Sequence, residues 1–252
     1  AKRGHLDVVR ELLAHGIPCT YDGANGAAEN GHLQGVQELR VHNIYCTRRG
    51  ADGAALRGHL EVVQDLHAHG VDCTAAGASS AAESGHLQVI RTLRAYGTHC
   101  MPSAANMAAQ NGHVEVVRDL RAHGIHCNSI GADWAASNGH LEVVQDLRAN
   151  GIHCTRDGAN GAAGNGHLEI VRDLRLHGIH CTSAGADEAA AKGLIGVVRS
   201  LREHGIHCTT RGANWAAMYN RQQVVQDLAA HGIHCSRDDD DDFDFCDGHG
   251  QR

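Results

Sequence analysis

Apolar residues in this chain recur in a pattern that predicts short helices with one buried face. In residues 167–178, "HLEIVRDLRLHG", they fall at i, i+2, i+3 and i+6, which gathers them on one side of a helix. These residues are Leu168, Ile170, Val171 and Leu174. Gly178 follows at the place where a residue in the left-handed conformation ends a helix. The segment therefore predicts a helix with a buried face and a glycine stop.

The segment before it predicts a second, shorter helix. Thr155 can cap its N-terminus, and Gly166 supplies its stop. Three alanines share one face at the spacing i, i+3, i+4, namely Ala159, Ala162 and Ala163. Because alanine is small, a helix with this face can approach its neighbours closely. Together the two segments predict a helix pair.

This pair recurs every 27 residues, and both cysteine and the Gly-His dipeptide keep the period. One pair is too small to bury its own apolar face, so stability must come from stacking neighbouring pairs. We therefore expect an all-α solenoid of stacked antiparallel helix pairs. It comprises a half repeat over residues 1–18, eight repeats over 19–235, and an acidic, disordered tail over 236–252.

The second half of each unit resembles the ankyrin repeat. In "AASNGHLEVVQDLRANG" and "AAGNGHLEIVRDLRLHG", an Ala-Ala pair ends the first helix, Gly-His turns the chain, and an apolar-rich segment opens the second helix. The resemblance covers residues 1–235. This repeat is shorter than the family's, which has about 33 residues, and "GAN" or "GAD" replaces its Thr-Pro-Leu-His signature.

The resemblance implies a fold and a role. The missing residues fall in the family's β-hairpin finger, so we expect short turns in its place, as in shortened arrays expanded in giant DNA viruses and some protists. Ankyrin arrays generally act as scaffolds or adaptors. The resemblance therefore implies a role in binding a protein partner. We expect a non-enzymatic monomer in the cytoplasm, that of the host if the protein is viral.

Charge and hydropathy argue against two classes of partner, nucleic acid and membrane. The formal net charge is −7, but the tail from Ser236 holds seven Asp and two Arg, so the body is nearly neutral. A phosphate-binding surface needs clustered Lys and Arg, which argues against nucleic acid. No stretch approaches the roughly 18 apolar residues of a membrane span.

The cysteines and histidines of "HGIHC" suggest a metal-binding or pH-responsive array as the alternative function. Stacked helix layers lie about 8–10 Å apart, which is too far for cysteines of successive repeats to share an ion or form a disulfide. Cys127 takes the position of an inward-facing Val in the ankyrin pattern, so we expect structural cysteines. No cofactor or metal is expected.

The histidines form three columns. We expect a turn role for the first, as at His32, His59 and His113, and a capping role in the last helical turn for the second, as at His15, His123 and His177. The third column, as at His126, His153 and His180, should face solvent and could respond to pH near 6.5. Nearly every histidine belongs to a repeating column, so nothing marks a catalytic copy.

The variable positions of the first helices predict the binding surface, because constant positions build the stack. Opposite the alanine face, the outward positions of one unit are Asp157, Gly161 and Gly164. The candidates for partner binding in or next to these columns are Arg49, Leu56, Met107, Ile130, Trp134, Trp215, Met218 and Tyr219. We expect one patch of Met107, Ile130 and Trp134, and another of Trp215, Met218 and Tyr219. Two alternatives remain: Trp134 folds over its own turn, or the array is a structural spacer.

Overall fold

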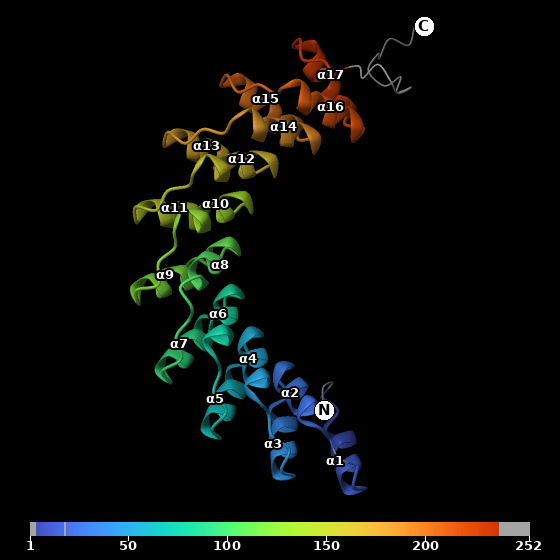
Figure 1. Ribbon diagram of the computed structural model, residues 1–252, viewed down its shortest axis with the longest axis vertical. Helices are drawn as coiled ribbons and strands as arrows, with labels where there is room; N and C mark the ends of the chain where they lie inside the picture. The colour runs from blue at the N-terminus through green and yellow to red at the C-terminus, as the bar shows by residue number, and fades with distance from the viewer. Residues whose placement is uncertain (1–3, 18, 237–252) are drawn as a thin grey trace. The chain divides into compact units, whose positions relative to one another are not determined.

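The computed structural model describes residues 4–17 and 19–236, and that part of the chain is all-α, without strands (Figure 1). The expected tail from residue 237 lies outside the described residues. The helices are α1 (Leu6–Ala14), α2 (Tyr21–Glu29), α3 (Leu33–Val41), α4 (Arg48–Leu56), α5 (Leu60–Ala68), α6 (Ala75–Glu83), α7 (Leu87–Ala95), α8 (Ala104–Gln110), α9 (Val114–Ala122), α10 (Ser129–Ser137), α11 (Leu141–Ala149), α12 (Arg156–Gly164), α13 (Leu168–Leu176), α14 (Ser183–Ala191), α15 (Ile195–Glu203), α16 (Thr210–Met218) and α17 (Gln222–Ala230). None of these helices is long and apolar enough to cross a membrane.

The chain divides into two compact units, Ala1–Cys127 and Asn128–Arg252. In the first unit, the first helices of the repeats, α2, α4, α6 and α8, form one row, and the second helices form another (Figure 1). The second unit is built in the same way, with α10, α12, α14 and α16 in its row of first helices. The expected architecture of stacked helix pairs is confirmed within each unit.

The α12–α13 pair shows how local sequence sets the elements. The Thr155 hydroxyl accepts a hydrogen bond from the backbone N–H of Asp157 at 3.2 Å, which confirms its capping role. Both Gly166 and Gly178 have positive φ, 86° and 79°, as a helix stop requires. The prediction of a shorter first helix is wrong, because α12 and α13 have nine residues each. Each helix ends two residues before its glycine.

The alanine face is the core between repeats. Ala159, Ala162 and Ala163 are no more than 1% exposed, and Ile170, Val171 and Leu174 of α13 are also buried. The side chains at these positions are buried in the same way from α2 to α15, whereas Ala217 of α16 and Val225 of α17 are half-buried. Small side chains in the first helices and branched ones in the second therefore fill the space between neighbouring pairs.

Within each unit, a polar side chain in the first helix of one repeat bonds to the next repeat. Asp187 of α14 is fully buried and accepts hydrogen bonds from the backbone N–H and the hydroxyl of Thr209, both at 2.7 Å. Thr209 is in turn the N-cap of α16. The corresponding backbone bond, across 22 residues, is accepted by Asn25, Asp52, Ser79, Asp133, Asn160 and Asn214. This polar column sets the register of successive first helices.

A glycine facing the polar column allows the close approach. A Cβ atom at Gly212 would lie 2.5 Å from Oδ1 of Asp187, and one at Gly50 would lie 2.6 Å from Oδ1 of Asn25. In one repeat Ala104 takes the glycine position. The residue at the polar position before it is Ser79, the smallest in that column. Side-chain size at the two positions is therefore matched across the repeat boundary.

The Gly-His turn also packs repeats together. A Cβ atom at Gly31 would lie 2.6 Å from Nδ1 of His59 in the next repeat, so glycine is required there for space as well as for its φ of 75°. Burial of the His59 imidazole lowers its pKa. The turn histidine thus contacts the preceding repeat in addition to joining the two helices.

Ion pairs connect successive second helices. Asp119 of α9 accepts hydrogen bonds from Arg91 Nε and Arg94 Nη2 of α7, both at 2.8 Å. Asp65 of α5 likewise accepts from both terminal nitrogens of Arg40 of α3, at 2.6 and 3.0 Å. In the second unit Asp173 of α13 and Asp227 of α17 occupy the same register. We call this set of inter-repeat pairs the ion-pair ladder.

Candidate protein-binding surface

The register represented by Asp157 is the most open part of the first helices. Its residue is exposed in every described repeat, including Arg49, Ile130 and Arg211. The side chain of Arg49 is 82% exposed, and its nearest ionic partner, Asp22 of the preceding repeat, is 3.8 Å away. This register is therefore available to a partner, as the helical pattern predicted.

The other two predicted outward positions are partly covered by neighbouring repeats. Gly164 is buried, and a Cβ atom there would lie 2.5 Å from Cδ of Glu188. Gly161 is half-buried, and a Cβ atom there would overlap Ser137. The prediction that Gly164 faces outward is wrong. A helical wheel considers one helix alone, and Glu188 of the adjoining helix covers this position.

The candidates of the first unit differ in exposure. Leu56, at the C-terminus of α4, is 41% exposed, whereas Met107 in the middle of α8 is half-buried. Met107 belongs to the first unit, while Ile130 and Trp134 belong to the second. The patch of Met107, Ile130 and Trp134 therefore stays a prediction.

Two apolar candidates lie on α10. Ile130 is 50% exposed and Trp134 is 43% exposed. They are four residues apart, so they occupy neighbouring places on one helix face. A tryptophan that keeps this much of its surface in solvent presents a large apolar area to a partner.

The candidate cluster with the most exposed apolar side chains lies on α16 and the residue that follows it. Met218 is 66% exposed and Tyr219 is 52% exposed, while Trp215, one turn earlier, is half-buried. The guanidinium carbon of Arg211 lies 4.9 Å from the centre of the Trp215 ring, which is a cation–π contact. We call Arg211, Trp215, Met218 and Tyr219 the α16 cluster.

The cysteine column packs inward. Cys154 is 8% exposed and Cys208 is 7% exposed, and each thiol donates to a backbone carbonyl of the preceding repeat at 3.3 Å. Burial raises the pKa of Cys154 and Cys208 to about 12. Buried, protonated thiols of this kind pack as small apolar side chains. Their structural role is confirmed for Cys127, which is also buried.

Most histidines of the second column cap their helices as expected. Nδ1 of His123 and of His177 lies 2.7 Å from the backbone oxygen four residues earlier, and Asn150 makes the same contact with its side-chain amide. His15 differs, since its Nε2 contacts the Glu11 carboxylate at 2.9 Å. His123, His177 and Asn150 therefore hydrogen-bond to backbone carbonyls that have no partner within the helix.

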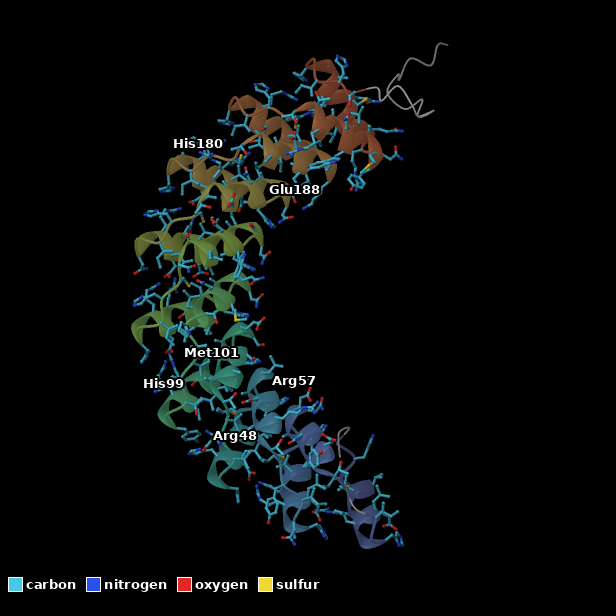
Figure 2. All side chains as sticks on the ribbon, viewed as in Figure 1. Arg48, Arg57, His99, Met101, His180 and Glu188 are labelled. Atoms are coloured by element: carbon cyan, nitrogen blue, oxygen red, sulfur yellow. The ribbon has the colours of Figure 1, made fainter. Side chains whose placement is uncertain are left out.

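The third column is exposed, as predicted, and it lies away from the first helices. Figure 2 shows His180 beside the second helices of its unit, while Glu188 lies on the side of the first helices. His126 and His153 are exposed like His180. Among the residues that the structure describes, no three His, Cys, Asp or Glu side chains are grouped so that they could hold a metal ion.

The comparisons with known proteins concern the fold. No family model and no curated protein matches the chain. Among solved structures, the crystal structure of the human ASB11 ankyrin repeat domain is similar, with a TM-score of 0.53 and 19% sequence identity. The match covers 62% of this chain and 84% of that one. The chain has an ankyrin-like repeat fold.

Within this ankyrin-like fold, two sets of residues were missed by the sequence reasoning. The polar column of Asn, Asp and Ser lies in the "GAN" or "GAD" segment. From the sequence alone, this segment was interpreted only as a replacement for the family signature, with no role assigned to it. The ion-pair ladder was visible as the recurring "RDLR" and "QDLR" segments. In both sets the bonding partners are 22 to 28 residues apart, so neither set is a local pattern.

Proposed function

We propose that this ankyrin-like array binds a protein partner through its first helices, without catalysing a reaction. The observation that carries the proposal is the α16 cluster, in which exposed Met218 and Tyr219 adjoin Trp215. Aromatic residues and arginine dominate the binding energy of protein interfaces. Large exposed apolar side chains that share a face commonly mark such interfaces.

Trp134 and Trp215 occupy the same register of α10 and α16, three repeats apart. Between them the register holds Gly161 and Glu188, both half-buried. A repeat spacing of about 8–10 Å would separate the two tryptophans by roughly 24–30 Å. A partner that lies along this row would contact an apolar anchor at each end and a small, polar surface between them.

The first step of the test identifies the partner by crosslinking. A photo-reactive residue is placed at Met218 and, as a control, at Leu176, and a partner of the first helices crosslinks only from Met218. Leu176 is 80% exposed but belongs to a second helix, α13. Isothermal titration calorimetry then measures the affinity of the purified partner.

Each of Trp134→Ala and Trp215→Ala should weaken binding about tenfold or more, as removal of an interface anchor does. Leu176→Ala should leave the affinity unchanged and controls for the loss of an exposed apolar side chain. Unchanged affinity in both tryptophan variants would remove the first helices as the binding site. Circular dichroism of each variant separates lost contacts from lost folding.

We also propose that the protein acts as a monomer in the cytoplasm, that of the host cell if it is viral, and that it does not bind nucleic acid. The near-neutral charge of residues 1–235 supports the last point. Light scattering coupled to size exclusion measures the oligomeric state directly. A mass of twice 26.8 kDa at micromolar concentration would contradict the monomer.

A further inference from the structure

The ion-pair ladder loses its carboxylate at one place in the second unit. Ser200 of α15 stands at the register that Asp173 occupies in α13 and Asp227 in α17. Ser200 is buried, with 8% exposure, as is Asp119 at the same register of α9. The helix that should donate to this position, α13, nevertheless keeps both of its arginines, Arg172 and Arg175.

The neighbouring steps show what these two arginine positions do. At the next step, Arg199 Nε and Arg202 Nη1 donate to the two oxygens of Asp227 at 2.7 and 2.5 Å. At the preceding step, Arg148 and Gln145 donate to Asp173, each with a contact of 3.2 Å. The donor geometry of the ladder is therefore built to hold one carboxylate group from two sides.

Arg175 has no acceptor in the described part of the chain. Its Nη1 atom is buried without a hydrogen-bond partner, and it is the one buried side-chain nitrogen or oxygen in residues 4–17 and 19–236 of which this is true. Arg172 forms no ion pair with any described residue either. Buried donors are almost always satisfied in folded proteins, and charged ones most strongly require an acceptor.

The thiol of Cys181 experiences the positive charge of Arg175 without the charge of a nearby aspartate. Burial raises the pKa of Cys181, and Arg175 lowers it without an opposing aspartate. At Cys208 the corresponding pair, Arg202 and Asp227, act in opposite directions on the thiol pKa. The local field at α13 and α15 is therefore more positive than at the other step.

A second break in the ladder lacks this property. Thr92 of α7 also replaces the aspartate, but the preceding helix carries His67 in place of arginine. Nδ1 of His67 lies 2.5 Å from Asp72, and its ring stacks on Tyr96 with 3.6 Å between ring centres. The donor at that break is already occupied, so only the break at Ser200 leaves a guanidinium without an acceptor among the described residues.

We propose that Arg172, Arg175 and Ser200 form a subsite for a single oxyanion, the carboxylate or phosphate group of a ligand. Serine is smaller than the aspartate that occupies this register elsewhere, and a guanidinium binds either group through paired N–H donors. The nearby carboxylates Asp173 and Asp227 are already bound by other arginines and do not compete. The subsite belongs to the second helices and is separate from the α16 cluster.

The subsite is tested by titrating the intact protein with sodium phosphate and with sodium acetate, each against sodium chloride at equal ionic strength. The arginine Nε–H signals in NMR spectra report the environment of each guanidinium. Saturable shifts of the Arg172 and Arg175 signals that chloride does not produce would support the proposal. Tighter binding of phosphate would assign the ligand group as a phosphate, and tighter binding of acetate as a carboxylate.

Two variants provide the matched comparison. Ser200→Asp restores the carboxylate, so it should abolish the anion-induced shifts and raise the Tm by about 2–4 °C. Thr92→Asp introduces the same carboxylate at a step where His67 replaces the donor arginine, so it should leave both the NMR shifts and the Tm unchanged. Arg175→Gln should also abolish the shifts, and it guards against misfolding of Ser200→Asp. Absence of a saturable shift, or equal shifts in wild type and Ser200→Asp, would overturn the subsite.

Discussion

At the residue scale, the spacing of the repeats depends on pairs of side chains whose sizes are matched. Gly212 leaves room for Asp187, and Asp187 in turn holds the backbone of Thr209. The sequence predicted the caps and the alanine face, because these depend on residues three or four apart. It did not predict the role of Asp187, because its bonding partner lies 22 residues away.

Gly212→Ala should destabilise the protein by about 1–3 kcal/mol, because its Cβ would lie 2.5 Å from Oδ1 of Asp187. Gly196→Ala is the matched control, since Gly196 also lies within a helix but has no heavy atom within 4 Å of an added Cβ. That variant should be neutral or up to about 1 kcal/mol more stable. Urea denaturation measures both, and equal effects of the two substitutions would contradict the role of close packing.

Asp187→Ala should cost about 1–3 kcal/mol, because it leaves the buried N–H of Thr209 without its acceptor. Asp187→Asn should cost much less, because Asn160 accepts the same backbone bond at 2.7 Å in the preceding repeat. The free energy of unfolding of the two variants decides the point. If Asn is as damaging as Ala, then the charge of Asp187, and not its hydrogen bonds, stabilises the stack.

At the scale of the element, each helix begins and ends where its own sequence directs, but its exposed face is set by the neighbouring repeat. The caps and glycines predicted the helix pairs, whereas Gly164 was misplaced because Glu188 of the next repeat covers it. The ion-pair ladder follows the same rule. It joins second helices through side chains that, taken on one helix alone, would be assigned to a solvated face.

Stability of the ladder should depend on acid. Burial by itself would raise the pKa of Asp119, but the hydrogen bonds from Arg91 and Arg94 outweigh it and lower that pKa. The hydrogen bond from Arg40 likewise lowers the pKa of Asp65. A carboxyl whose folded-state pKa is lowered stabilises the fold above its unfolded pKa of about 3.9, and this contribution is lost as the pH falls through the folded value.

Wild type should therefore lose stability steeply below about pH 4, and Asp119→Asn should be less stable at pH 7 but lose less on acidification. Denaturation midpoints measured from pH 7 to pH 3 test the difference. Glu115→Gln is the control, because Glu115 is on the same helix but its side chain is 66% exposed. Parallel acid profiles for wild type and Asp119→Asn would show that the ladder does not contribute.

At the scale of the whole molecule, histidine dominates the response to pH. The chain has 22 histidines against a formal net charge of −7 with histidine neutral, and its isoelectric point is about 6.3. The third histidine column, including His126, His153 and His180, is exposed. The composition was therefore enough to predict the net charge, whereas the structure was needed to show how exposed each histidine column is.

The electrophoretic mobility should change sign close to pH 6.3, from negative above this pH to positive below it. Electrophoretic light scattering at several pH values measures this directly. A crossing point far from pH 6.3 would contradict this prediction.

The buried cysteines give most repeats a chemical probe at a similar depth. A maleimide reagent reaches a thiol such as Cys46, Cys73, Cys154 or Cys208 only when its repeat opens, because each is 7–8% exposed. Mass spectrometry of the labelled peptides would then yield a separate opening rate for each repeat. Without any engineered label, the chain can report along its length where it comes apart first.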